Sequence, residues 1–311
     1  MKTVGFFSSR SGVGATTLIY HLAWMYQELG IKTLVMDLDS QADLTTALLP
    51  QEDVLDLLTR GGPTIYGMLE EGGGCEPQVQ RIGEFLALLP GDPNLVILEE
   101  SFAWAWIFRN DSMEGPTANK LTTNFSRLAR QAAEMEEAQL VLIDAGAGLN
   151  AIQRAAFLAC DAVIVPLRLD PISLFGIPSL GLSLRNWRSK WKGQTGSREM
   201  EDLGYVILQD STSSGQRLAP PLYHPAFLGT PEGSPAPKPD PYHLGTVKRY
   251  PSLLPLSHDA RKPMFLLKPA DGAIGSHVAA VRDCYRDFKQ LALRIASACG
   301  ITVPPEDLPL V

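Results

Sequence analysis

The sequence predicts an α/β protein with a doubly wound, mostly parallel sheet and helices on both faces. Short apolar runs of about four to six residues recur along the chain, and stretches with helical periodicity separate them. A glycine-rich turn follows the first run and precedes a helix. The chain has 311 residues, of which 45% are hydrophobic, so it can bury one large core. We therefore expect a single domain over residues 1–311.

Six segments have the length and composition of buried strands. Each is short and apolar, as strands of a sheet covered on both faces should be. The predicted strands span residues 3–7, 33–37, 85–89, 140–144, 162–166 and 204–208.

Two long helices are predicted near the ends of the chain. Residues 16–29 place Leu18, Met25 and other apolar side chains at helical spacing, and Gly30 follows as a C-terminal stop. Residues 275–299 carry one apolar stripe. We expect the second helix to close the domain.

Prolines accumulate in residues 212–258, most densely between residues 231 and 241. Proline has no backbone N–H and a fixed φ, so residues 231–241 cannot form a regular helix or a central strand. We expect residues 212–258 to be an insertion or mobile loop within the domain. A plain surface loop and a segment that binds a partner both remain open, because proline-rich segments are also common peptide ligands.

The loop after the first predicted strand has the sequence SRSGVGATT over residues 9–17. A phosphate-binding loop needs glycines, so that backbone N–H groups can turn toward the anion, and a helix N-terminus behind them. Gly12 and Gly14 supply the glycines, and Thr16 opens the helix. The usual pattern G-x-x-x-x-G-K-[ST] is matched only at Gly14 and Thr16. Alone, this loop is equally typical of a tight structural turn.

Acidic residues at two strand ends strengthen the phosphate-binding interpretation. Asp37 and Asp39 end the second predicted strand, and Asp144 ends the fourth. Doubly wound sheets bind ligands at the carboxyl ends of their strands. An acid there can hold Mg²⁺ or its bound water near the Thr16 hydroxyl, because Mg²⁺ prefers oxygen ligands. Alternatively, these carboxylates only cap the segments that follow their strands.

In these segments the chain resembles the ParA/MinD family of deviant phosphate-loop ATPases. Residues 10–17 look like the family's K-G-G-V-G-K-T-T, residues 37–45 look like its D-L-D-P-Q-x-N-x-T, and Asp144 looks like its later strand-end acid. The similarity continues through most of the chain outside the proline-rich segment. It implies an ATP-binding protein that uses Mg²⁺, forms a homodimer on nucleotide binding and acts in positioning, partitioning or regulation through a partner protein.

The resemblance also implies roles for individual residues. Asp39 would position the attacking water, and Arg10 would be a second catalytic residue, reaching across the dimer interface. Thr16 and Asp144 would serve Mg²⁺. The nucleotide would be bound by Ser11, Gly12, Val13, Gly14, Ala15, Thr16 and Thr17.

Both lysines of the family motif are missing. Arg10 stands at the signature lysine, Ser11 at the first glycine and Ala15 at the phosphate-loop lysine. A lysine about 4 Å from a phosphate charge contributes roughly 4 kcal/mol at an effective dielectric near 20. Its absence would weaken nucleotide binding by about two to three orders of magnitude, unless another group replaces it. We therefore expect an ATP-dependent switch with weak or absent hydrolysis.

Two alternatives remain open at this point. A non-hydrolysing pseudo-ATPase would keep the fold as a scaffold or regulatory module, and Ala15 is the main argument for it. A synthetase-like member of the superfamily would use the phosphate site for small-molecule chemistry, but no nucleophile or metal cluster accompanies the loop.

The remaining features bear on partners and location. The net charge of −7 argues against nucleic acid covering the whole surface. Residues 185–192 interleave basic and aromatic side chains, a pattern we interpret mainly as helix packing. Arg282, Arg286 and Lys289 lie on one side of the last helix, but Asp283 and Asp287 interrupt them, so DNA is only weakly supported as a partner.

The sequence also carries expectations about membranes and redox state. Residues 303–311 are acidic and broken by prolines, so no basic amphipathic membrane anchor is seen there. Scattered cysteines without a C-x-x-C spacing indicate neither zinc nor a disulfide framework. We expect a cytoplasmic protein.

Overall fold

The computed structural model describes residues 1–60, 62–70, 76–191, 200–209, 219–234 and 237–304. These residues form one eight-stranded sheet with the order β3-β4-β2-β5-β1-β6-β7-β8. Every neighbouring pair is parallel except β3 and β4. The strands are β1 (Lys2–Ser8), β2 (Thr33–Asp37), β3 (Gln80–Arg81), β4 (Leu86–Leu89), β5 (Leu140–Ala147), β6 (Ala162–Leu167), β7 (Glu201–Gln209) and β8 (His243–Lys248).

The predicted fold class is confirmed. All six predicted strands are present, and β2 has the predicted bounds. The two strands that were not predicted, β3 and β8, lie at the two edges of the sheet. An edge strand has only one paired neighbour and needs a less continuous apolar run, so its sequence signal is weaker.

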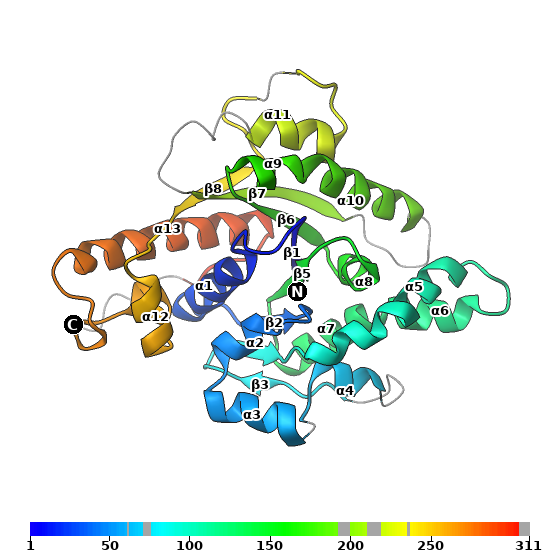
Figure 1. The fold of residues 1–311 in the computed structure, drawn as a ribbon, viewed down its shortest axis with the longest axis horizontal. Coiled ribbons are helices and arrows are strands. Elements are labelled where there is room, and N and C mark those ends of the chain that lie inside the picture. The colour runs from blue at the N-terminus through cyan, green and yellow to red at the C-terminus, as the bar shows by residue number, and fades with distance from the viewer. Residues whose placement is uncertain (61, 71–75, 192–199, 210–218, 235–236, 305–311) are drawn as a thin grey trace.

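Helices connect the strands and cover the sheet (Figure 1). The described helices are α1 (Ala15–Glu28), α2 (Asp43–Leu48), α3 (Gln51–Arg60), α4 (Ile65–Glu70), α5 (Glu99–Phe108), α6 (Gly115–Thr122), α7 (Asn124–Met135), α8 (Ala151–Leu158), α9 (Pro171–Phe175), α10 (Ile177–Trp191), α11 (Ala219–Tyr223), α12 (Leu254–Ala260) and α13 (Ser276–Ala298). Shorter turns are η1 (Pro93–Leu98), the π-helical η3 (His224–Leu228), η4 (Met264–Leu266) and η5 (Pro269–Asp271). The two long helices predicted near the ends of the chain correspond to α1 and α13.

The sheet separates two apolar cores. Figure 1 shows α1 and α13 on one side of the sheet and α5, α7, α8 and α10 on the other. Alternating residues of β2 illustrate the division, because Val35 packs in the core beneath α1 and α13, whereas Leu34 and Met36 pack in the opposite one. Close packing also fixes the centre of the sheet. A side chain at Gly5 would approach the Cys160 Sγ to 2.4 Å.

The proline-rich segment is not a loop throughout. Its described part contains α11, η3, β8 and α12. Prolines stand in the first turns of η3 and α12, where a missing N–H costs nothing. These elements show regular structure within the segment, and its interpretation as an insertion or mobile loop stays a prediction. Residues 212–218 and 235–236 lie outside the described residues, and mobility of the segment stays a prediction.

The strand register places the candidate acids at one edge. Asp144 of β5 pairs with Asp37 of β2 on one side and with Phe6 of β1 on the other. All three strands run parallel, so these residues and the loop that follows β1 share the carboxyl edge of the sheet. The topology thereby brings together segments more than 100 residues apart.

Candidate phosphate-binding site

The loop between β1 and α1 has the backbone of an anion-binding turn. Gly12 and Gly14 have φ of 75° and 100°, in the region that favours glycine. Gly14 is the N-cap of α1, and its carbonyl accepts the N–H of Leu18 at 2.9 Å. Ser11 and Gly12 are exposed, whereas Val13 is buried and anchors the loop. Exposed backbone at a helix N-terminus is a suitable place for phosphate.

Thr16 and Asp144 meet at the base of this loop. The Thr16 hydroxyl donates to Asp144 Oδ2 at 2.7 Å, and the Gly146 N–H donates to Asp144 Oδ1 at 3.1 Å. The Asp144 side chain is buried, and Thr16 is half-buried. A hydroxyl and a carboxylate oxygen side by side form the kind of donor pair that Mg²⁺ uses when phosphate and water complete its shell.

The protein alone offers only part of a metal site. Within the described ranges there is no group of three or more histidine, cysteine, aspartate or glutamate side chains arranged to hold a metal ion. Thr16 and Asp144 supply two oxygen atoms to a Mg²⁺ ion, and phosphate and water oxygens would have to complete its shell.

Asp37 has a structural role in the same region. It accepts the backbone N–H of Thr45 at 2.8 Å, the Thr45 hydroxyl at 2.7 Å and the Asp39 N–H at 3.2 Å. The Thr45 hydroxyl in turn accepts the Gly91 N–H at 2.8 Å. These bonds fix the segment between β2 and α2, which carries Asp39. Asp37 thus caps the segment that follows its strand, as the alternative interpretation of the sequence expected.

Burial makes the two acids at the strand ends reluctant to ionise. It raises the pKa of Asp37 to about 7, and the charge of Asp144 adds to this effect. Burial also raises the pKa of Asp144 to about 6, although hydrogen bonds from Thr16 and Gly146 act in the opposite direction. A cation at Asp144 would relieve this cost.

Asp39 lies next to this pair. Its Oδ1 accepts the N–H of Gln41 at 3.0 Å, and the side chain is half-buried. A side chain at Gly146 would approach the Asp39 Cγ to 3.0 Å, so the glycine permits the close approach of the two segments. The negative charge of Asp39 also acts on Asp144. The structure thus brings together Asp39, Thr16 and Asp144, three of the residues selected from the sequence.

Arg10 points to a different neighbour. Its side chain is 42% exposed, and its Nη1 lies 3.8 Å from Asp170 Oδ1, in the segment after β6. The sequence interpretation missed two residues here. Arg168 Nη1 donates to the Gly12 carbonyl at 3.3 Å, and Arg168 Nε lies 3.5 Å from Asp170 Oδ2. Their position directly after a predicted central strand was a signal that could have found them, since β6 is the neighbour of β1.

A cavity opens beside the loop. It has a volume of about 410 Å³ and lies between α1, α2 and α12. Thr16, Thr17 and Tyr20 line it from α1, and Arg261 and His258 line it from α12. Arg261 is fixed across the cavity by its hydrogen bond to the Thr46 carbonyl at 2.8 Å. Space for a small ligand is therefore available next to the predicted phosphate site.

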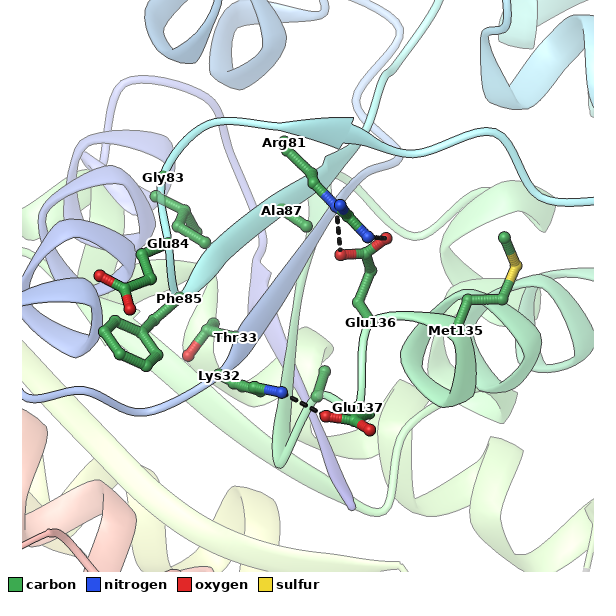
Figure 2. A pocket seen from close by; sticks show the side chains of 12 residues that line it. Lys32, Thr33, Arg81, Gly83, Glu84, Phe85, Ala87, Met135, Glu136 and Glu137 are labelled. Carbon is green, nitrogen blue, oxygen red and sulfur yellow. Dashed lines mark hydrogen bonds and ion pairs between the residues drawn. The ribbon is translucent and has the colours of Figure 1, made fainter.

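A second pocket lies at the opposite edge of the sheet (Figure 2). Arg81 pairs with both carboxylate oxygens of Glu136 at 3.0 and 3.2 Å, and Lys32 pairs with Glu137. These residues lie at the amino ends of β2 and β4 or just before β5, away from the phosphate loop. Arg81 and Lys32 form ion pairs with the glutamates of the same pocket. Doubly wound sheets bind ligands at the carboxyl ends of their strands instead. We assign this pocket no role in nucleotide binding.

Trp187 of α10 packs in the core. Trp187 is 7% exposed and meets Phe157 edge to face at 5.6 Å. The Arg154 guanidinium lies 5.9 Å from the Trp187 ring centre. On α13, Arg286 pairs with Asp283 at 2.5 Å. Lys192 lies outside the described residues, and DNA binding stays a prediction.

No helix within the described ranges is long and apolar enough to cross a membrane.

Comparisons with known proteins identify the family of the chain. A family model described as an AAA domain matches residues 1–194. The chromosome-partitioning ATPase Soj of Thermus thermophilus is 29% identical over 189 residues, which cover 61% of this chain and 64% of Soj. Protein IncC of Escherichia coli is 28% identical over 197 residues, 61% of this chain and 47% of IncC. The matched part thus spans between about half and two thirds of these relatives.

Solved structures share the fold over nearly the whole chain. A protein from Corynebacterium diphtheriae superposes with a TM-score of 0.68 at 20% identity, covering 96% of this chain and 99% of that one. A putative plasmid partition protein from Borrelia burgdorferi, bound to AMPPNP, gives a TM-score of 0.63 at 17% identity, covering 95% and 98%. At these identities the likeness concerns the fold alone.

Proposed function

The chain belongs to the AAA-domain family and, within it, to the ParA/MinD group of partitioning and positioning ATPases, and on that premise we propose that it is an ATP-dependent dimeric switch with weak or absent hydrolysis. In this proposal, ATP binds at residues 11–17 and the bound state is recognised by a partner protein.

One observation carries the proposal. The Thr16 hydroxyl and the buried Asp144 carboxylate are 2.7 Å apart at the base of a loop whose glycines are left-handed. A buried carboxylate with a raised pKa is costly for folding, and such groups concentrate at functional sites. A purely structural turn does not need this arrangement, whereas a site for phosphate and Mg²⁺ does.

The residues at the site fit Mg²⁺ and can be given roles. Thr16 and Asp144 would hold the ion, which would supply positive charge to the phosphates. The backbone N–H groups of residues 11–17 would bind phosphate oxygens, with the N-terminal dipole of α1 behind them. Asp39, which is half-buried beside Gly146, would orient a water molecule.

Slow hydrolysis follows from Ala15. Phosphoryl transfer is accelerated mainly by positive charge and positioning around the transferred group. Alanine at position 15 contributes neither, although Gly14 and Thr16 keep the loop and its metal ligand. We therefore expect nucleotide binding to persist better than turnover.

The surface beside the loop supports a dimer. The short helix α9 presents Ile172, which is 68% exposed, and Phe175, which is 89% exposed. Both follow Asp170, the residue that pairs with Arg10. Apolar side chains next to a charged ligand site are suited to contact with a second subunit once nucleotide has joined the two halves.

The alternative is a pseudo-ATPase that acts as a scaffold or regulatory module. The absence of a lysine at Ala15 favours it. It differs from the switch in one property, because its association with partners does not depend on nucleotide.

Two variants separate catalysis from binding. Asp39→Ala should abolish residual phosphate release and leave ATP affinity within about threefold, because Asp39 is placed to orient water rather than to bind phosphate. Asp53→Ala removes an exposed acid on α3 and serves as the control, with both properties unchanged. Equal loss of binding and turnover in Asp39→Ala would contradict the assigned role. Phosphate release at wild-type rates in Asp39→Ala would do the same.

A further inference from the structure

Arg168 brings a positive charge to the phosphate loop from another strand. It follows β6, which pairs with β1. Its Nη1 donates to the Gly12 carbonyl oxygen at 3.3 Å, so the guanidinium lies against the loop backbone itself. The side chain is 31% exposed, less than the 42% of Arg10.

Asp170 holds this arginine in place. It is the N-cap of α9 and accepts the Ser173 N–H at 2.9 Å and the Ser173 hydroxyl at 2.8 Å. Its two oxygens then face Arg168 Nε at 3.5 Å and Arg10 Nη1 at 3.8 Å. Asp170 thus faces the positively charged side chains of both Arg168 and Arg10. The contacts of Arg168 with the Gly12 carbonyl and with the anchored Asp170 carboxylate restrict the motion of its guanidinium.

The carboxylate is itself held ionised. Burial acts to raise the pKa of Asp170, but the Ser173 hydrogen bonds and the charges of Arg168 and Arg10 outweigh it and lower the pKa. An ionised Asp170 at neutral pH attracts both arginines, and Arg168 also contacts the loop backbone at Gly12.

A phosphate chain needs such a charge here. Ala15 cannot provide it, and backbone N–H groups carry only partial charges. Guanidinium groups bind phosphate oxygens well, because their donors form a planar fork. Arg168 contacts Gly12, within the loop expected to bind phosphate, whereas Arg10 reaches the same cluster only through Asp170.

We propose that Arg168 supplies, within the same subunit, the phosphate-binding cation that Ala15 lacks. This inference rests on the proposed nucleotide binding and names the residue that makes it feasible. Asp170 is a positioning residue for it. The ligand chemistry that Arg168 recognises is a di- or triphosphate chain, with less effect on a monophosphate.

The test is a titration of matched variants with ATP, ADP and AMP in the presence of Mg²⁺. Arg168→Ala should weaken ATP and ADP binding by about 10- to 100-fold and AMP binding by less, as expected for one lost charge near phosphate. Arg81→Ala removes an exposed, ion-paired arginine at the opposite edge of the sheet and should bind like the wild type (Figure 2).

A rescue experiment makes the test independent of folding. Ala15→Lys should restore affinity by at least tenfold in the Arg168→Ala background, but should improve the otherwise unchanged protein by less than about threefold. If Arg168→Ala fails to fold, the small gain of Ala15→Lys alone still tests the inference.

The possible failures are distinguishable. Tight ATP binding by the wild type, unchanged in Arg168→Ala, would overturn the role of Arg168 and leave the proposed function intact. A large gain from Ala15→Lys in the otherwise unchanged protein would also overturn it, because the cation would then be missing. No binding to either the wild type or Ala15→Lys at millimolar ATP would overturn both proposals.

Discussion

Replacing Asp144 by asparagine should stabilise the folded protein at pH 8 and remove its response to Mg²⁺ and nucleotide. Asp144 is buried beside Asp37, and burial raises its pKa from 3.8 to about 6. A group whose pKa is higher in the folded state contributes stability below its unfolded pKa and loses that contribution as pH rises through the folded value. The stability is therefore lost between about pH 4 and pH 6.

The magnitude follows from the same values. A rise from 3.8 to about 6 corresponds to roughly 3 kcal/mol of free energy of unfolding at pH 8. Asparagine does not ionise, and its oxygen can still accept the Thr16 hydroxyl. Its amide nitrogen cannot accept the Gly146 N–H, which costs about 1 kcal/mol. The net expected gain of Asp144→Asn is about 1 to 2 kcal/mol at pH 8. At pH 4 the side chain at position 144 of the folded protein is uncharged in both the wild type and Asp144→Asn. The lost hydrogen bond from Gly146 then leaves the variant slightly less stable.

Urea unfolding between pH 4 and pH 8 measures this difference. Asp53→Asn, an exposed acid on α3, provides the control and should give a nearly flat difference from the wild type. At pH 8, Mg²⁺ with ATP should raise the stability of the wild type and not that of Asp144→Asn. An Asp144→Asn protein that is less stable at pH 8, or a difference that does not change with pH, would refute the reasoning.

Three further predictions concern His21, Gly14 and Trp187. Burial lowers the pKa of His21 from 6.5 to about 4. The neutral imidazole therefore stabilises the fold above pH 6.5, and the free energy of unfolding should fall by about 3 kcal/mol between pH 6.5 and pH 4. Acid unfolding measures this dependence, and His21→Leu should flatten it. Gly14→Ala should lower the free energy of unfolding by about 1 to 2 kcal/mol and weaken ATP binding in calorimetry, because φ at this position is 100° and the new Cβ would lie 3.3 Å from a Leu208 methyl group. Gly233 also has a positive φ, and Gly233→Ala should lower stability without changing ATP binding. Trp187→Ala should cost about 3 to 5 kcal/mol in urea unfolding and leave any DNA mobility shift unchanged, since the ring is buried; a lost shift at full stability would contradict this.

The central strands and the phosphate loop could be predicted because their signals are local. A strand buried on both faces is a continuous apolar run, and Gly12 and Gly14 mark a turn by their backbone freedom. The proximity of Thr16 to Asp144 could also be predicted, because parallel strands bring their carboxyl ends together even when they are 128 residues apart.

The rest depended on tertiary contacts that no local pattern reveals. Arg168 reaches Gly12 across 156 residues, and although its position after a predicted central strand placed it near the sheet edge, no sequence pattern indicated this contact. Arg10 pairs with Asp170 within the chain, a contact the sequence did not indicate, and its role across a dimer interface stays a prediction. Strand β8 was missed since prolines surround it and only two of its six residues are buried.

Calorimetric titration of the purified wild-type protein with ATP, with and without Mg²⁺, is the direct test of nucleotide binding at the phosphate loop. We expect binding in the micromolar range that is strengthened by Mg²⁺, because Thr16 and Asp144 would hold the ion and the loop would hold the phosphates. Phosphate release on the same sample should be slow. No heat of binding at millimolar ATP, or an affinity that Mg²⁺ leaves unchanged, would show that residues 11–17 with Thr16 and Asp144 are not an ATP and Mg²⁺ site.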